Sequence, residues 1–285
     1  MKLSFSTLGC PDWTIEHIAA KAREYGYDGV ELRVHADGKH LSPADAPDRV
    51  GRAAALFREA GVEIAALSAY AEYGSAEPAK AAENAGLTRA LIRMACAAGA
   101  GMVRVYGGAG GKDEPRDRVA DRVVRALRPL AAEAREAGVR LAIETHDVWN
   151  SGADLVKIVR GVGDPGLAVC FDIHNTLHVT HEWHESYALL KPHIAYCHIK
   201  DACPTINGGS RLVMVGAGEL PLRDIVRQLK RDGFAGYLNL EWEKRWCPDL
   251  EPPERVFPQY LWKMRQEWAE AGGETAERNR AANPH

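Results

Sequence analysis

Eight short apolar runs alternate along the chain with eight helix-like stretches, and this alternation constrains the fold more than any other sequence feature. Each run has the length and composition of a buried β-strand, and helical crossovers between such strands make a parallel sheet the expected outcome. The predicted strands are residues 2–6, 29–33, 62–67, 102–106, 139–144, 167–172, 194–199 and 236–241. The predicted helices are residues 14–25, 47–60, 79–99, 115–138, 152–161, 183–191, 220–232 and 254–271.

The number of repeats and the chain length together decide between an open and a closed sheet. An open doubly wound sheet satisfies the alternation as well, but eight strand–helix units favour closure. The 285 residues fit one barrel, since such barrels commonly have about 250 residues. We therefore predict an α/β fold with a single (β/α)8 TIM barrel of parallel strands over residues 1–271, followed by a polar tail over residues 272–285.

Charge and composition narrow the classes of partner. The net charge of −3 and the sequence pI near 6.4 provide no basic surface for a phosphate backbone, so nucleic acid is not an expected partner. The N-terminal residues show neither a signal-peptide core nor a membrane span, and the six cysteines form no Cys-x-x-Cys pair. We expect a protein of the reducing cytoplasm that acts on a small molecule.

Four of the later strand-like runs end on residues that bind divalent cations. These residues are Glu144, Asp172, His198 and Glu241. Side chains in a strand alternate between two faces, so every second residue points toward the axis of a barrel. The apolar alternation places each of these four residues on the axis side, although the run that ends on His198, residues 193–198, fits less cleanly, with Ala195 and Cys197 assigned outward. The four side chains are therefore expected to converge at one mouth of the barrel.

Three carboxylates and one imidazole form a donor set made mostly of oxygen. A single acidic residue at the end of a strand is usually a helix cap or an ion-pair partner. Four such residues around one axis favour a cation site, because unneutralised carboxylates repel one another. This donor set suits Mn²⁺ best, with Mg²⁺, Co²⁺ and Zn²⁺ as alternatives, and it leaves open positions for two vicinal substrate oxygens.

Short motifs around these positions carry a resemblance to a known family. They read Gly-Tyr-Asp-Gly-Val-Glu-Leu-Arg (26–33), Ile-Glu-Thr-His-Asp (143–147), Phe-Asp-Ile-His-Asn (171–175), His-Ile-Lys-Asp (198–201), Gly-Ala-Gly-Glu (216–219) and Leu-Glu-Trp-Glu (240–243). In its order and strand placement the set resembles the xylose isomerase-like TIM barrel superfamily, in the sugar phosphate isomerase/epimerase branch. The resemblance covers about residues 1–270.

The resemblance implies one divalent ion held by Glu144, Asp172, His198 and Glu241. In the ketose 3-epimerase members one glutamate removes a substrate proton and the other returns it, and Glu144 and Glu241 match these positions. The implied function is a metal-dependent sugar isomerase or epimerase that acts on a ketose or keto-polyol through α-proton abstraction and an enediolate. Barrels of this family often pair through rim loops, so a homo-oligomer is compatible with it.

Five further residues are candidate substrate contacts: His174, Lys200, Arg211, Trp13 and Tyr70. His174 lies one residue earlier than the family's histidine. Lys200 has inward parity and is suited to neutralising an anion, and Arg211 matches a substrate-contacting arginine, but both also fit ordinary rim charges. Trp13 and Tyr70 lie in the expected loops after strands, where aromatic side chains pack on a sugar face or complete the core.

Two other groups of residues receive structural or solvated roles. Glu31 and Arg33 share inward parity on the second strand, and we predict that they form a buried ion pair. His178, His181 and His184 follow the sixth strand, and we interpret them as solvated loop residues and not as a second metal site.

Four other functions remain open. A keto-inositol dehydratase, or a lyase or hydrolase of 3-keto-glycosides, would use the same metal site and the same proton removal. An apurinic endonuclease requires further histidines on the third and fourth strands, whereas residues 68–70 and 106–108 contain none. A non-catalytic sugar-binding barrel does not require the complete set of four ligands. The last two functions are therefore less favoured.

Overall fold

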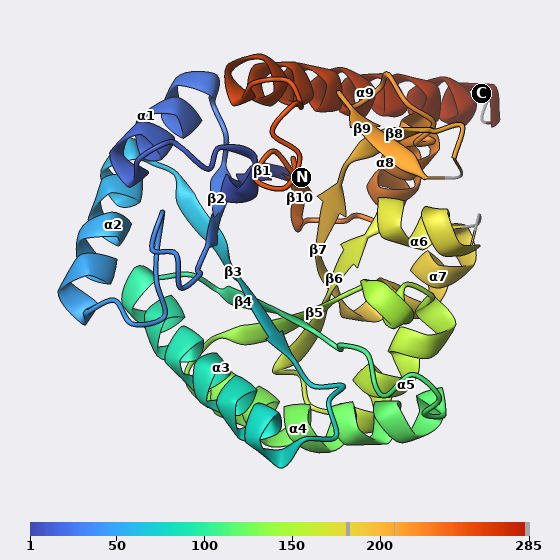
Figure 1. Cartoon of the computed structure of the whole chain (residues 1–285). Coiled ribbons are helices and arrows are strands. Elements are labelled where there is room, and N and C mark those ends of the chain that lie inside the picture. Colours follow the sequence, from blue (N-terminus) through green and yellow to red (C-terminus); the bar gives the residue numbers. More distant parts are fainter. Residues whose placement is uncertain (181–182, 208, 283–285) are drawn as a thin grey trace.

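Eight parallel strands close into a barrel in the computed structural model of the chain, and helices surround it (Figure 1). The structure describes residues 1–180, 183–207 and 209–282, without the side chains of Val179 and residues 272–282. The order of strands around the barrel is β1 (Lys2–Ser6), β10 (Tyr237–Leu240), β7 (Ile194–Ile199), β6 (Leu167–Asp172), β5 (Arg140–Glu144), β4 (Met102–Tyr106), β3 (Glu63–Glu72) and β2 (Gly29–Arg33). The predicted (β/α)8 TIM barrel is confirmed.

The helices cover the outside of the barrel because each buries an apolar face against the strands. They are α1 (Ile15–Tyr25), α2 (Pro47–Ala60), α3 (Pro78–Ala98), α4 (Arg116–Glu136), α5 (Gly152–Val162), α6 (Ile173–Thr180), α7 (Trp183–Leu190), α8 (Leu222–Arg231) and α9 (Pro253–Ala282), with short 3-10 helices at Thr7–Gly9, Asp147–Trp149 and Lys191–His193. Seven of the eight predicted helices agree with these bounds to within two residues, whereas α9 continues beyond residue 271. Among the described residues, no helix combines the length and the apolarity needed to cross a membrane.

Two elements at the carboxyl end of the barrel are absent from the sequence-based prediction. Helix α6 starts directly after β6, because a carboxylate oxygen of Asp172 accepts a hydrogen bond from the backbone N–H of Asn175 at 2.8 Å and caps the first turn. Strands β8 (Asp201–Pro204) and β9 (Ser210–Val213) pair as an antiparallel hairpin after β7. Both elements extend the rim where the four candidate ligands are expected.

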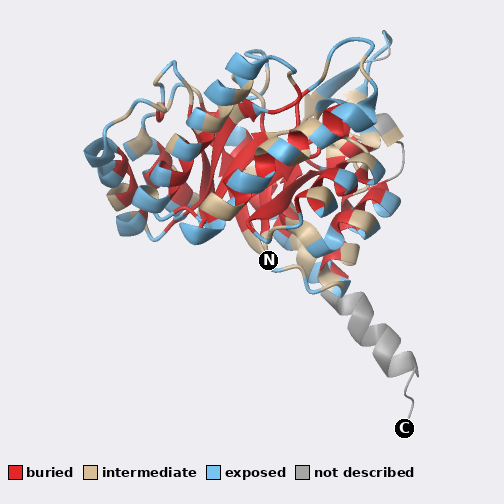
Figure 2. Cartoon of the chain, turned by 90° about the horizontal axis from the view of Figure 1, so that it is seen from below, coloured by how far each residue is buried: buried red, intermediate tan, exposed pale blue. Residues whose placement is uncertain are grey.

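Buried residues occupy the strands and the helix faces that turn toward them (Figure 2), and they form two layers, one between strands and helices and one inside the barrel. Residues predicted to face the helices, such as Ile143 and Leu240, belong to the outer layer. The inner layer consists of Ala65, Ala66, Met102, Ala142, Ala168, Cys170, Ala195, Tyr196 and Tyr237. This apolar layer fills the barrel below the mouth, so polar chemistry is confined to its carboxyl end.

Strand β7 contains an irregularity that affects the phase of its side chains. Ile194 pairs with Val169, and the next paired residue, Tyr196, lies opposite Cys170. Ala195 is therefore an additional residue in this strand. It belongs to the inner layer, so its predicted outward orientation is wrong, whereas Cys197 faces outward as predicted. The extra residue explains why this run fits a strict alternation poorly.

Candidate metal centre

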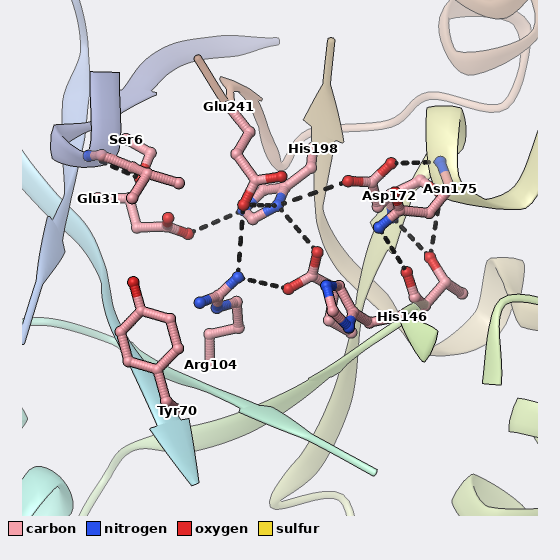
Figure 3. Close-up of polar contacts among 12 residues, drawn as sticks. Ser6, Glu31, Tyr70, Arg104, His146, Asp172, Asn175, His198 and Glu241 are labelled. Atoms are coloured by element: carbon pink, nitrogen blue, oxygen red, sulfur yellow. Dashed lines mark hydrogen bonds and ion pairs between the residues drawn. The ribbon is translucent and has the colours of Figure 1, made fainter. Parts of the chain in front are cut away.

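The four candidate ligands come together at the carboxyl end of the barrel, and Figure 3 labels Asp172, His198 and Glu241 among them. Glu144 ends β5, Asp172 ends β6, His198 lies in β7, and Glu241 directly follows β10. One donor atom of each residue lies within 4.8 Å of the donor atoms of the other three. The side chains of Glu144, Asp172 and His198 are fully buried, and Glu241 is 5% exposed. The alternation of strand faces thus produces one compact cluster.

Several polar atoms inside this cluster have no hydrogen-bond partner. They are Glu144 Oε1, Asp172 Oδ2 and His198 Nδ1. His198 Nδ1 lies 3.4 Å from Glu144 Oε1 and 3.3 Å from Glu241 Oε1, outside hydrogen-bond geometry. Unpaired buried polar atoms are costly, and a cation among them would satisfy all of them at once. The donor set of three carboxylates and one imidazole therefore fits a hard divalent ion.

The outer oxygens of the three carboxylates are held by other protein groups. Arg104 Nη1 donates to Glu144 Oε2 at 2.6 Å. Lys200 Nζ donates to Glu241 Oε2 at 2.7 Å, and the backbone N–H of Asn175 donates to Asp172 Oδ1. Asp172 Oδ2 also lies 3.0 Å from Lys200 Nζ, although without hydrogen-bond geometry. Each carboxylate is thus held through one oxygen and presents the other toward the centre, where Glu241 Oε1 also accepts a longer hydrogen bond from Arg104 Nη1 at 3.4 Å.

A hydrogen bond from β2 orients the imidazole of His198. Its Nε2 lies 2.9 Å from Glu31 Oε2, which also accepts a hydrogen bond from the hydroxyl of Tyr196 at 2.9 Å. A carboxylate acceptor favours the proton on Nε2 and leaves the Nδ1 lone pair directed toward the centre. Glu31 therefore supports the geometry that a metal ligand requires.

The predicted ion pair between Glu31 and Arg33 is wrong. Arg33 instead donates to Asp37 at 2.8 Å and to the hydroxyl of Tyr70 at 2.9 Å. Both residues point into the barrel, but Arg33 lies two positions closer to the mouth and reaches the rim loops. Glu31 lies at the depth of His198, so its carboxylate meets the imidazole.

The charges of this region shift the pKa values of the carboxyl groups. Burial raises the pKa of Glu144, but the charge of Arg104 outweighs burial and the pKa falls to about 2. Burial also raises the pKa of Glu241, and Lys200 and His198 hold it well below its usual value. For Asp172 burial prevails over Lys200, and the pKa rises to about 6. Both glutamates are therefore anionic at neutral pH.

Arg104 is the main component of the centre that the sequence analysis missed. It lies in β4, is 2% exposed, and contacts Glu241 Oε1 at 3.4 Å in addition to Glu144. Its guanidinium carbon lies 4.5 Å from the ring centroid of Tyr106. An arginine between Val103 and Val105 in an apolar strand is the signal that would have identified it.

His146 is a second residue near the centre without a predicted role. Its Nδ1 lies 2.9 Å from Asp147 Oδ2, and its ring lies 4.5 Å from that of Tyr106. Asp147 has a φ of 52°, a left-handed conformation that is unusual for a residue other than glycine. The strained turn after β5 therefore presents the imidazole at the edge of the site.

The structure places three of the five candidate substrate contacts along one cavity. Lys200, His174 and Arg211 line a cavity of about 920 Å³ beside the centre. Lys200 contacts Asp172, Glu241 and Glu243 and is 4% exposed, so it belongs to the centre itself. Arg211 lies on the exposed hairpin strand β9 and His174 in the first turn of α6.

The two aromatic candidates occupy different places. Tyr70 lies beside the centre, with its ring centroid 5.9 Å from the guanidinium carbon of Arg104. Trp13 is not brought to the centre. It contacts Glu254 and Phe257 and lines a separate cavity of about 760 Å³ between α1 and α2. The sequence places Trp13 after β1, but this position does not indicate whether the side chain turns toward the centre or toward the helices.

The histidines after β6 form no separate grouping of ligands in the part of the chain that the structure describes. Only the four candidate ligands, and an overlapping set that includes Cys170, are close enough to hold a metal ion there. The rings of His174 and His178 are 6.2 Å apart, and His181 lies outside the described residues.

Comparisons with known proteins agree with the fold. A sequence model of the family described as xylose isomerase-like TIM barrel matches residues 19–266, so the chain belongs to this family. No curated protein matches the chain in sequence.

Solved structures of similar fold include epimerases and a probable dehydratase. An L-ribulose 3-epimerase has a TM-score of 0.80 at 19% identity, covering 96% of this chain and 97% of that chain. A probable 3-DHS dehydratase, AsbF from Bacillus anthracis, has a TM-score of 0.75 at 17% identity, covering 92% of this chain and 97% of that chain. A 3-keto-D-glucoside 4-epimerase, YcjR from E. coli, has a TM-score of 0.75 at 16% identity, covering 93% of this chain and 99% of that chain. At these identities the likeness concerns the fold.

Proposed function

We propose that this protein is a divalent-metal-dependent sugar isomerase or epimerase that acts on a ketose or keto-polyol. The observation that carries the proposal is the set of unpaired donor atoms of Glu144, Asp172 and His198, which converge with Glu241 in a buried cluster. Buried carboxylates with inward-facing free oxygens are unfavourable unless a cation neutralises them. Mn²⁺ is the proposed ion, because the donor set is rich in oxygen.

The four ligand residues would hold the ion, and the chain's own carboxylates would move the proton. When bound, the ion supplies a Lewis acid that makes the hydrogen beside the substrate carbonyl more acidic. Glu144 and Glu241 come from β5 and β10, which are separated in the barrel by β6 and β7, so they approach a substrate from different sides. One glutamate removes the proton from the carbon beside the carbonyl and the other returns it to the opposite face.

Arg104 and Lys200 keep the two glutamates ionised and oriented for this transfer. Each cation holds the outer oxygen of one glutamate, and the resulting low pKa means that a proton, once accepted, is readily given back. Lys200 also faces the cavity, where it would contact substrate oxygens together with His174 and Arg211. These contacts explain how a polyol is oriented above the cluster.

Elimination of water is the second candidate reaction, and one contact favours it. Lys200 Nζ lies between the centre and Glu243 Oε1, at 2.8 Å from the latter, and both residues line the cavity. A cation in this place is suited to hydrogen-bonding a departing hydroxyl, which would leave as water with the proton that a glutamate has removed from the substrate. Epimerisation and dehydration therefore share the first step and differ in the second.

Metal analysis followed by a hydrogen-exchange screen tests the proposal. The purified protein is supplied with Mn²⁺ in deuterated water and offered free ketoses and keto-inositols, and the carbon beside the carbonyl is followed by NMR. We expect deuterium at this carbon together with an epimeric or isomeric product. Deuterium with loss of water would assign the dehydratase instead. A protein that binds no divalent ion, or one that turns over substrate while retaining the original proton, would contradict the proposal.

A further inference from the structure

The cavity beside the metal centre extends well beyond the space that a single sugar ring occupies. Its volume of about 920 Å³ is near the upper end of pockets that enclose drug-sized ligands, roughly 300–1,000 Å³. Lys200 and Asn175 line the cavity and also hold Glu241 and Asp172, so the cavity is continuous with the centre. A substrate bound at the centre therefore has room for a substituent that reaches outward.

The outer walls of this cavity carry apolar side chains on both sides, beside the polar residues Ser210, Arg211, Asp249 and Glu251. Leu212 and Met214 belong to the hairpin strand β9 and the residues that follow it, and Trp246 and Leu250 lie in the segment between β10 and α9. Their side chains offer no acceptors for sugar hydroxyls, apart from the indole N–H as a donor. A hydroxyl placed against such a wall would lose its hydrogen bonds to water without replacement. The part of the ligand that contacts these walls is therefore expected to be apolar.

Trp246 is an exposed aromatic side chain that is nevertheless held in place. It is 51% exposed, yet its ring lies 5.7 Å from the guanidinium carbon of Arg33 and 5.5 Å from that of Arg245. Its ring also meets Tyr70 edge to face, with centroids 6.3 Å apart. A large apolar side chain that is both exposed and fixed in orientation provides contact area at low entropic cost, which is typical of binding sites.

We propose that the substrate is a glycoside whose keto-sugar part binds at the centre and whose flat, apolar aglycone lies against Trp246, Met214 and Leu212. This inference rests on the proposed function, since it takes the keto-sugar end to be bound at the metal centre. It adds a second binding site for an aryl group, so specificity depends on the aglycone as well as on the sugar.

Paired ligands that differ only in the aglycone test the inference. Methyl and phenyl 3-keto-β-glucoside are titrated into the Mn²⁺-loaded protein by calorimetry. We expect the phenyl compound to bind roughly ten-fold more tightly, as a stacked aromatic contact provides. Trp246→Ala should bring the ratio of the two dissociation constants close to one. Trp262→Ala is the matched control, because Trp262 is 63% exposed on α9 and does not line the cavity, and it should leave the ratio unchanged.

The outcomes separate this inference from the proposed function. Equal binding of the two glucosides, with deuterium exchange on both, overturns the aglycone site while the proposed function stands. If neither glucoside binds, phenol alone is examined by saturation-transfer NMR. Transfer to phenol that disappears in Trp246→Ala and persists in Trp262→Ala supports the aglycone site. Absence of transfer to phenol overturns it.

Discussion

The two halves of the barrel contribute to the centre in different ways. Strands β5, β6 and β7 and the residue after β10 supply the four candidate ligands, and the inner donor atoms of Glu144, Asp172 and His198 lack hydrogen-bond partners. Strands β2 and β4, on the other side, supply Glu31 and Arg104, whose contacts are directed at the ligands themselves. One half thus provides the candidate ligands together with Lys200 and Asn175, which hold Glu241 and Asp172, and the other half adds the groups that hold His198 and Glu144. Changes in the first half should abolish function, and changes in the second should weaken it.

Loss of one ligand should produce the largest effect. Glu241→Gln removes a negative donor and a proposed proton carrier, so turnover should fall by about 1,000-fold or more and the bound metal should be lost. The deuterium-exchange assay and metal analysis measure these two results. Glu243→Gln is the control, because Glu243 also contacts Lys200 but lies outside the cluster. An active, metal-free Glu241→Gln protein would remove the distinction between the two halves.

Removal of Arg104 should lower the free energy of unfolding, although it leaves all four candidate metal ligands present. Arg104→Met leaves Glu144 as a buried carboxylate without its closest cation, which should cost about 3–5 kcal/mol of unfolding free energy in the presence of a chelator. Mn²⁺ at about a hundred times its dissociation constant should restore about 3 kcal/mol. Urea denaturation measures both values. Arg89→Met breaks an exposed pair with Glu133 and should cost no more than about 1 kcal/mol.

The hydrogen bond from Glu31 should influence metal affinity more modestly. Glu31→Gln weakens the acceptor at His198 Nε2, so the dissociation constant for Mn²⁺ should rise about 10–100-fold with the fold retained. Competition with a chelator gives the affinity, and nitrogen chemical shifts give the tautomer of His198. Glu63→Gln, which alters an exposed contact with Lys2, serves as control. Unchanged affinity and tautomer would show that β2 does not orient the ligand.

The smallest expected difference lies at the rim above β2. Burial raises the pKa of Asp37, but hydrogen bonds from Arg33 and from the backbone of Lys39 lower it to about 2. Because the folded pKa is depressed, the stabilisation is complete above about pH 4 and is lost as the pH falls toward 2. Asp37→Asn should therefore cost about 1 kcal/mol at pH 6 and almost nothing near pH 2.

Urea midpoints of the Asp37→Asn and unaltered proteins at several pH values measure this difference. Asp12→Asn is the control, since the carboxylate of Asp12 pairs with Lys39 but is 83% exposed. A cost that is the same at all pH values would show that the carboxylate of Asp37 contributes through packing and not through its charge.

The ligand half of the barrel could be predicted from the sequence because its signals are local. A carboxylate or imidazole at the end of an apolar run is chemically distinctive, and the period of two fixes the face on which it lies. Glu144 and Glu241 could therefore be assigned to the same mouth although they are far apart in the chain. The boundaries of the strands followed from the same runs, with β3 extending further than expected, to Glu72.

The supporting half could not be predicted because its partners are defined only by closure of the barrel. Arg104 and Glu144 are brought together by pairing of β4 with β5, and nothing in the local sequence of either residue names the other. Glu31 was predicted to pair with Arg33 because both face the barrel axis on the same strand. Its actual partner, His198, lies at the same depth in the barrel on a distant strand. The alternation of side chains along a strand gives the face on which a residue lies, but it gives neither the distance of that residue from the barrel mouth nor its partner.

The additional residue in β7 sets a condition on this chain that concerns residue number and not residue identity. Ala195 shifts the phase of the strand so that Tyr196 and His198 face the axis. Because each residue in a strand reverses the face, loss of one residue between Ile194 and His198 would leave a regular strand in which His198 still lies opposite Asp172 and faces the axis, whereas loss of a second residue would turn the imidazole toward the helices. Insertions and deletions are tolerated in surface loops, where only length changes. In this strand, evolution and protein engineering can remove one residue and keep the imidazole on the axis side, but they cannot remove two.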